Sequence, residues 1–337
     1  MRRFLESGYC DIESILSVKV PFIFVIGGRG TGKTYGALKY ALDTNTCIML
    51  MRRTQAQTDL INKPEFSPFK PLEHDLRQQI TVKAASKYNS VVYRGEDPDD
   101  LIGYTCALST VANLRGFDAS NVKLLIYDEF IAEHHERPIK NEGTAFLNAY
   151  ETMNRNRELK GKDPLQVLCL ANAFDIANPI FRELDLISVC DKMKQKQNPV
   201  YVNKSRGVCI VMLDGSEISE RKSKTALYKL TAGSQYGELA LSNDFTYNSN
   251  AGIKPQHLRE YKPVCGIGDI YIYKHKSKHL YYVSEHQSGN MPHYETDEVD
   301  LKRFIRHYGR FLYSAYMNER CIFESMLAKS TFEWYIV

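Results

Sequence analysis

Several features are missing from this 337-residue sequence, and each absence excludes a class of protein. The eight cysteines stand singly and none forms a C-x-x-C pair, which argues against a zinc site and for small buried thiols in a reducing compartment. No apolar run approaches the roughly 20 residues that a membrane span needs. The first residues lack the apolar core of a secretory signal peptide. We therefore expect a globular protein of the cytoplasm with no membrane segment.

An excess of charge of either sign is also absent, because 44 basic and 40 acidic residues leave a formal net charge of only +4. This balance is compatible with a nucleic-acid partner but does not argue for one. The length favours two domains over one.

The most informative motif is a glycine-rich stretch that fits the pattern G-x-x-x-x-G-K-[ST]. An apolar, β-branched run precedes it and a helix-compatible run follows it, so the stretch predicts a phosphate-binding loop between a strand and a helix. Backbone N–H groups of such a loop, together with the positive end of the helix dipole, bind phosphate oxygens. Lys33 is expected to contact the β- and γ-phosphates of ATP, and Thr34 to hold Mg²⁺. The predicted nucleotide-binding residues are Gly27, Gly28, Arg29, Gly30, Thr31, Gly32, Lys33 and Thr34.

The remaining pattern predicts an α/β protein built on a mainly parallel sheet. Short apolar runs without strict alternation are typical of strands buried on both faces, and they occur at 20–26, 46–51, 103–109, 122–127 and 165–170. Residues 79–94 predict an antiparallel hairpin at one edge of the sheet. We expect an ATPase domain over 1–205, a polar linker or lid over 206–240, and a smaller α+β domain over 241–337. In the last, 270–273 and 280–284 predict a hairpin, and 296–308 predicts a helix that ends at Gly309.

Two adjacent carboxylates end an apolar strand at 124–127. Asp128 is placed to hold Mg²⁺, and Glu129 to polarise the water that attacks the γ-phosphate. A second strand ends at Asn172, which suits a polar sensor of the γ-phosphate. Arg155 and Arg157 precede that strand, and an inserted arginine can stabilise the charge of a transferring phosphoryl group. A solvated helix end would also favour arginines at these positions.

Together these residues resemble the DNA-packaging ATPases of phi29-like tailed bacteriophages, which are relatives of the large terminases. The resemblance covers most of the chain. It rests on the phosphate loop with its strand, on Met51-Arg52-Arg53, Ile126-Tyr127-Asp128-Glu129-Phe130-Ile131 and Arg155-Asn156-Arg157-Glu158, and on Leu168 to Ala173 with Asn178-Pro179 and Gln235-Tyr236-Gly237-Glu238.

The resemblance implies an ASCE-type P-loop ATPase domain and an RNase H-like C-terminal domain without nuclease chemistry. It implies that Asp128 is the Walker B acid, Glu129 the catalytic base, Asn172 part of a coupling motif and Arg155 a finger acting on the neighbouring subunit. The implied activity is ATP-driven translocation of double-stranded DNA into a procapsid. The implied assembly is a homopentameric ring docked on the capsid portal in the host cytoplasm, in some members through a packaging RNA. The family's basic residue after the paired arginines is matched by Thr54-Gln55, which departs from the pattern.

The C-terminal part is compatible with more than one function. A live metal-dependent nuclease, as in a full terminase, needs converging carboxylates, and we interpret Asp269, Glu285, Asp297, Glu298 and Asp300 as surface acids instead. Lys274, Lys276 and Lys278, interleaved with tyrosine and histidine, are a candidate nucleic-acid surface. For the whole chain, a nucleotide-gated DNA-binding protein with little turnover and a helicase are two further functions that the motifs permit.

Overall fold

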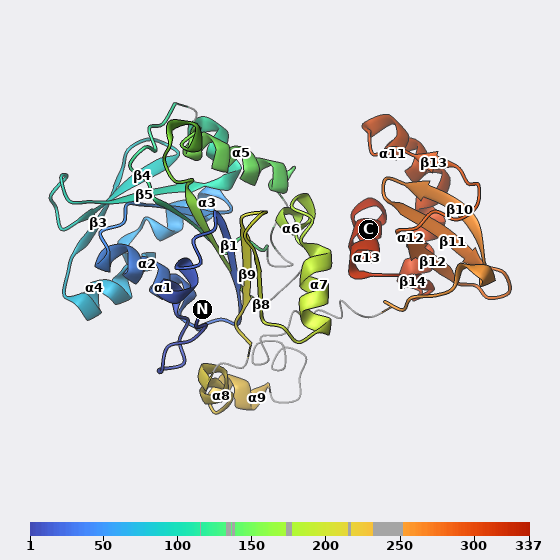
Figure 1. Ribbon diagram of the computed structural model, residues 1–337, viewed down its shortest axis with the longest axis horizontal. Helices are drawn as coiled ribbons and strands as arrows, with labels where there is room; N and C mark the ends of the chain where they lie inside the picture. Colours follow the sequence, from blue (N-terminus) through green and yellow to red (C-terminus); the bar gives the residue numbers. More distant parts are fainter. Residues whose placement is uncertain (115, 133–135, 137–138, 173–176, 215–216, 232–251) are drawn as a thin grey trace. The chain divides into compact units, whose positions relative to one another are not determined.

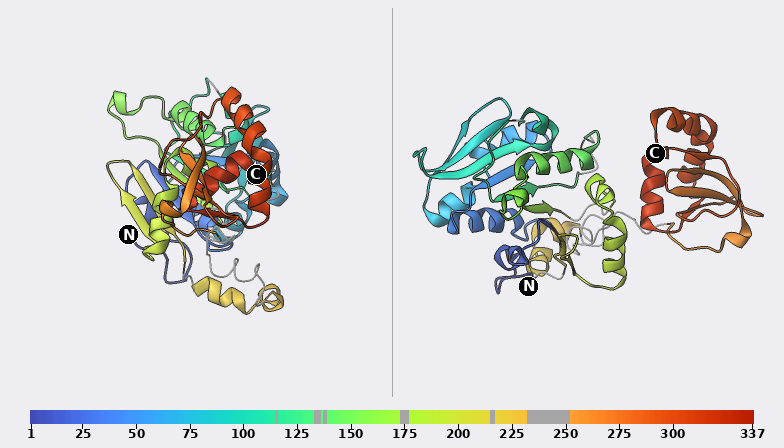
Figure 2. Two further views of the ribbon diagram at one scale, coloured as in Figure 1. Left: turned by 90° about the vertical axis from the view of Figure 1, so that its right-hand side faces the viewer. Right: turned by 45° about the horizontal axis from the view of Figure 1, so that its top comes forward.

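The computed structural model describes the chain except for residues 115, 133–135, 137–138, 173–176, 215–216 and 232–251. It divides into two compact units (Figures 1 and 2). The larger unit comprises residues 1–184 and 192–247, and the smaller comprises 185–191 and 248–337. Part of the expected linker belongs to the larger unit, because residues 208–212 form a buried strand of its sheet. No described helix is long and apolar enough to cross a membrane.

The larger unit is built on a nine-stranded sheet of order β3-β4-β5-β2-β6-β7-β1-β9-β8. The strands are β1 (Phe22–Ile26), β2 (Ile48–Arg52), β3 (Ile80–Ala84), β4 (Asn89–Arg94), β5 (Leu101–Ala107), β6 (Leu124–Asp128), β7 (Gln166–Ala171), β8 (Val200–Asn203) and β9 (Val208–Met212). From β5 to β9 in this order the neighbours are parallel, whereas β3–β4, β4–β5 and β8–β9 are antiparallel. The predicted parallel sheet and edge hairpin are confirmed. Every residue of β2, β6 and β9 is buried, as expected for strands covered on both faces.

Alternating side chains of the sheet pack against two different sets of helices. On one face Ile23 and Val25 join a core with α1 (Ile12–Leu16), α2 (Lys33–Asp43) and α4 (Lys70–Leu76). On the other face Phe22 packs against Phe146 of α5 (Glu142–Asn154), and Phe24 packs against Phe181 of α6 (Pro179–Glu183). Figure 1 shows α5 on the opposite side of the sheet from α1, α2 and α4. The structure also describes α3 (Gln55–Ile61), α8 (Glu217–Ser223) and α9 (Ala226–Leu230) in the larger unit, and α7 (Ile187–Gln195), which the division into units splits after residue 191.

The smaller unit contains a five-stranded sheet of order β13-β10-β11-β12-β14. Its strands are β10 (Tyr261–Ile267), β11 (Ile270–His275), β12 (Tyr281–Ser284), β13 (His293–Tyr294) and β14 (Cys321–Phe323), and its helices are α11 (Glu298–Phe304), α12 (Arg310–Met317) and α13 (Met326–Ile336). The predicted β11–β12 hairpin is confirmed.

The predicted helix over 296–308 is wrong at both ends. Asp297 caps it, because its side chain accepts the N–H groups of Val299 and Asp300. Gly309 does not end it, because this glycine has a helical φ of −53° and a π-helical turn over 305–309 leads directly into α12. A helix stop at glycine requires the left-handed conformation, which Gly309 does not adopt.

Candidate active site

The phosphate loop connects the carboxyl end of β1 to the start of α2, as the sequence predicts. Gly30 and Gly32 have φ values of 75° and 81°, in the left-handed region that glycine tolerates best. Gly27 has no room for a side chain, because a Cβ there would lie 2.5 Å from Cβ of Leu213. The turn that aims backbone N–H groups at a phosphate therefore depends on these glycines.

Lys33 lies inside the loop, with its side chain folded back over it. Its Nζ donates to the carbonyl oxygens of Gly27 at 2.7 Å and Gly28 at 2.9 Å, and lies 3.4 Å from Oδ1 of Asn172. The end of β7 is thus brought to the lysine by the pairing of β7 with β1. Asn172 and Lys33 thus lie side by side, while the sensor role of Asn172 stays a prediction.

The acid pair lies at the carboxyl end of β6, opposite the start of α2. The Thr34 hydroxyl is 3.0 Å from both carboxylate oxygens of Asp128, which is 3% exposed. Hydroxyl and carboxylate oxygens are the ligands that Mg²⁺ prefers, so these two side chains fit the expected ion. Glu129 has a φ of 56°, which is uncommon for a residue other than glycine. Backbone strain of this kind is concentrated at functional sites.

An arginine to which no sequence motif gave a role contacts both acids. Arg52 Nη2 lies 2.8 Å from Oδ2 of Asp128, and Nη1 forms an ion pair with Glu129. The β2–β6 register pairs Met51 with Tyr127, so the next residues of the two strands come together. The paired arginines in Met51-Arg52-Arg53 were the sequence signal for this contact. Only the strand order shows that β2 adjoins β6, which brings Arg52 to the acids. Arg52 holds the expected base at the site's edge by charge attraction.

Arg53 points away from the acid pair into a buried polar network. Its side chain is fully buried, with Nε 2.7 Å and Nη2 2.9 Å from the two carboxylate oxygens of Glu142, the first residue of α5. Its Nη1 lies 2.8 Å from Glu136. Burial lowers the pKa of Arg53, but the hydrogen bond and charge of Glu142 outweigh it and raise that pKa above its ordinary value. Arg53 therefore stays charged and attaches α5 to the carboxyl edge of the sheet.

Arg53→Ala is expected to destabilise the larger unit by about 3–5 kcal/mol, because it leaves the Glu142 carboxylate buried without its counter-charge. Arg221→Ala is the matched control. The Arg221–Glu217 pair is long, at 3.9 Å, and its side chains are 69% and 67% exposed, so its loss should cost at most about 1 kcal/mol. Urea unfolding of both variants measures the difference. Equal stabilities would show that the Arg53 network contributes little.

A cavity of about 440 Å³ lies over this constellation. Lys33, Thr34, Asp128, Glu129 and Asn172 line it, together with Arg29, Gly30, Gly32, Tyr35 and Ala171. A glycine loop, one lysine, a hydroxyl–carboxylate pair and a second carboxylate are the donor and acceptor set that a magnesium nucleoside triphosphate requires.

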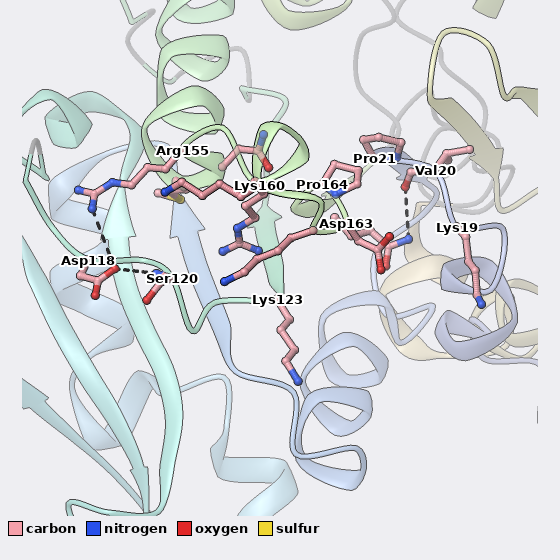
Figure 3. A pocket seen from close by; sticks show the side chains of 15 residues that line it. Lys19, Val20, Pro21, Asp118, Ser120, Lys123, Arg155, Lys160, Asp163 and Pro164 are labelled. Atoms are coloured by element: carbon pink, nitrogen blue, oxygen red, sulfur yellow. Dashed lines mark hydrogen bonds and ion pairs between the residues drawn. The ribbon is translucent and has the colours of Figure 1, made fainter.

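Arg155 lies elsewhere, in a larger cavity of about 790 Å³ (Figure 3). It follows α5 in the left-handed conformation, with a φ of 44°, and its side chain points toward Asp118, at 4.0 Å. This cavity adjoins the amino ends of the strands, since Pro21 precedes β1 and Lys123 precedes β6. The 13 residues of α5 span about 20 Å at 1.5 Å per residue, so Arg155 is remote from the phosphate loop of its own chain.

The second arginine of the motif has a structural role. Arg157 Nη2 donates to the carbonyl oxygens of Ala119 at 2.8 Å and Val122 at 2.6 Å, so it attaches this turn to the segment that enters β6. Burial lowers the pKa of its guanidinium. Arg155, whose side chain is 41% exposed, is the arginine of the pair that can reach another molecule.

The candidate residues of the smaller unit do not converge. Asp297 caps α11, Asp300 pairs with Arg303 and Glu298 pairs with Lys302. Among the described residues no group of three or more His, Cys, Asp and Glu side chains is placed to hold a metal ion. In the β11–β12 hairpin, Lys276 donates to the Arg259 carbonyl oxygen at 2.6 Å.

The hairpin tip is organised by a histidine. Nδ1 of His275 accepts the N–H groups of Ser277 at 3.1 Å and Lys278 at 3.0 Å. The contact of Lys274, Lys276 and Lys278 with nucleic acid stays a prediction. The motif Gln235 to Glu238 lies outside the described residues.

Comparison with known proteins identifies the family. The profile of the Podovirus DNA encapsidation protein (Gp16) matches residues 5–313. The DNA packaging protein of Bacillus phage phi29 is 28% identical over 259 residues, which is 74% of this chain and 69% of that protein. The DNA packaging protein of Bacillus phage B103 is 26% identical over 330 residues, which is 91% of this chain and 94% of that protein.

Two solved structures have the same fold. A structure of the bacteriophage Phi-29 viral genome packaging motor assembly superposes with a TM-score of 0.67 at 21% identity, covering 98% of this chain and 99% of that one. A structure of the Phi-28 gp11 DNA packaging motor gives a TM-score of 0.65 at 20% identity, covering 98% and 97%. The resemblance inferred from the sequence is confirmed, and the chain belongs to the Podovirus DNA encapsidation protein (Gp16) family.

Proposed function

We propose that this chain is the ATP-hydrolysing subunit of a motor that translocates double-stranded DNA into a viral procapsid. The observation that carries the proposal is the convergence of Lys33, Thr34, Asp128, Glu129 and Asn172 on one cavity at the carboxyl edge of the sheet. Family membership supplies the DNA-packaging context, because the relatives are DNA packaging proteins.

Each side chain has a distinct task in this proposal. Lys33 and the loop N–H groups bind the β- and γ-phosphates, and Asn172 contacts the γ-phosphate. Thr34 and Asp128 would hold Mg²⁺, which supplies charge neutralisation between the phosphates. Glu129 orients the attacking water and takes its proton. Because Arg52 pairs with Glu129, the base must leave or share that ion pair when it engages the water.

The position of Arg155 supports hydrolysis at subunit interfaces. A finger at the amino edge of the sheet, separated from the carboxyl edge by the length of α5, can act only on the nucleotide of another copy. A contact between the amino edge of one subunit and the carboxyl edge of the next is head-to-tail. Repeated head-to-tail contacts form a ring where the rotation between subunits closes and an open filament where it does not. We propose a homo-oligomeric ring, with the pentamer as the expected number of subunits.

The partners follow from the same assignment. The relatives with solved structures are packaging motors, one of them in a motor assembly. We propose that the ring binds double-stranded DNA and docks on the capsid portal in the host cytoplasm, with a packaging RNA as a further candidate partner. The C-terminal unit is proposed to be an RNase H-like nucleic-acid-binding domain without nuclease activity. Plasmid nicking that depends on Mg²⁺ or Mn²⁺ would favour a live nuclease instead.

Lys33→Ala is expected to abolish ATP binding, because the β- and γ-phosphates lose their fixed counter-charge. ATP binding is measured by calorimetry with the purified protein, and ATP hydrolysis is measured with and without double-stranded DNA. Lys39→Ala is the matched control, since Lys39 lies on the same helix but pairs with Asp43 at the surface. Binding at wild-type affinity in Lys33→Ala would contradict the phosphate-loop assignment. If DNA does not stimulate ATP hydrolysis by the wild type, the proposed motor function is contradicted.

A further inference from the structure

The segment that precedes β1 lies directly against the phosphate loop. The backbone N–H of Cys10 donates to the carbonyl oxygen of Thr31 at 2.9 Å, and Cys10 forms an antiparallel bridge with Phe4. Arg3 Nη1 donates to the carbonyl oxygen of Met212, at the end of β9, at 2.7 Å. The segment is therefore held at two points, one on the loop and one on the neighbouring strand.

Tyr9 is the side chain that this segment places on the loop. A Cβ built on Gly32 would lie 2.9 Å from Cδ1 of Tyr9 and 3.4 Å from its Cγ, so the ring lies on the Gly32 backbone. Gly32 lines the phosphate cavity and is the N-cap of α2. The Tyr9 side chain is nevertheless 46% exposed. Within the described part of the chain, its hydroxyl makes no hydrogen bond.

The other tyrosine near the loop, Tyr35 in the first turn of α2, is hydrogen-bonded to a different helix. The Tyr35 hydroxyl donates to Oδ2 of Asp75 at 2.8 Å, and burial together with that hydrogen bond raises the pKa of Tyr35 to about 12. Tyr35 is therefore tethered to α4. Tyr9, by contrast, lies on the loop with an exposed ring.

The direction of a bound nucleotide explains such a ring. Asp128 and Glu129 mark the γ-phosphate end of the cavity, so we infer that the α-phosphate and the base lie on the side of the start of α2 that is away from these acids. Tyr9 lies at that start, against Gly32. Aromatic side chains provide stacking surfaces for nucleobases, because every base has a π-face.

We propose that Tyr9 is the stacking platform for the base of the nucleoside triphosphate. This inference rests on the proposed nucleotide site and adds the subsite that distinguishes a nucleotide from a simple polyphosphate. The ring supplies affinity through its face, and the hydroxyl contributes nothing to it.

The experiment compares ADP with inorganic tripolyphosphate, which has the phosphates but no base. Calorimetry with the full chain gives both dissociation constants for the wild type, Tyr9→Ala, Tyr9→Phe and the control Tyr88→Ala. Tyr88 is partly exposed in the turn between β3 and β4, remote in sequence from the loop. Tyr9→Ala is expected to weaken ADP binding by about 5- to 150-fold, the range for losing one base-stacking ring. Its tripolyphosphate binding should be unchanged, and Tyr9→Phe and Tyr88→Ala should bind both probes as the wild type does.

Three results would overturn the proposal, and they differ from one another. Unchanged ADP binding in Tyr9→Ala would show that the ring does not stack on the base. An equal loss for ADP and tripolyphosphate would show that Tyr9 only supports the loop. Wild-type protein that binds neither probe would refute the nucleotide site itself, and the proposed function with it.

Discussion

Arg155→Ala is expected to lower ATP hydrolysis by about 10³–10⁵-fold, the usual effect of removing an arginine finger. ATP binding should be unaffected, because Arg155 lies at the amino edge of the sheet and does not line the phosphate cavity. Lys160→Ala is the control, since Lys160 lines the same cavity as Arg155. It should reduce hydrolysis far less, because a lysine at that position lacks the forked geometry of a guanidinium. Similar losses in both variants would indicate a general charge effect and not a finger.

Mixing experiments separate action in trans from action in cis. Glu129→Gln subunits keep Arg155 but lack the base, whereas Arg155→Ala subunits keep the base but lack the finger. Mixed oligomers should recover part of the ATPase activity, because one subunit can supply its arginine to the base-containing site of the next. The recovery should depend on protein concentration, since the composite site exists only in the assembly. Verified mixed oligomers without recovery would leave Arg155 with a structural role or a role in cis.

Glu129→Gln is expected to leave ATP binding intact and to slow hydrolysis by about 10²–10⁴-fold, the usual contribution of a general base. The amide cannot take the proton of the attacking water. Binding should persist because Lys33, Thr34 and Asp128 are unchanged, and Arg52 keeps its ion pair with Asp128.

Glu136→Gln is the matched control for the loss of a carboxylate. Glu136 also pairs with an arginine, Arg53, but it does not line the phosphate cavity. Its replacement should have little effect on the rate of hydrolysis. Single-turnover hydrolysis with both variants measures the chemical step directly. A near-wild-type rate in Glu129→Gln, with tight ATP binding, would place the base elsewhere.

The sequence by itself determined the parts of the site that are local in the chain. The phosphate loop is specified by glycines and by the residue types next to them, because its φ values and N–H directions depend on neighbouring residues. The buried strands and the acid pair at 128–129 are equally local, since a run without alternation predicts burial on both faces. The predicted helix end at Gly309 also rested on local sequence, and this prediction was wrong. The helix continues through a π-helical turn, because tertiary packing overrode the helix-ending propensity of glycine.

Only the tertiary structure decided which distant residues meet at each edge of the sheet. Strand order places β2 beside β6, and this brings Arg52 to Asp128 and Glu129. It also places β9 beside β1, so residues 208–212 belong to the larger unit and not to a linker. Strand neighbours are set by long-range packing and not by local sequence, so no motif carries this information. The same reason explains Tyr9 and Arg155. The contact of Tyr9 with Gly32 and the separation of Arg155 from its own phosphate loop both depend on how the chain crosses the sheet. Spacing along the sequence does not encode that path.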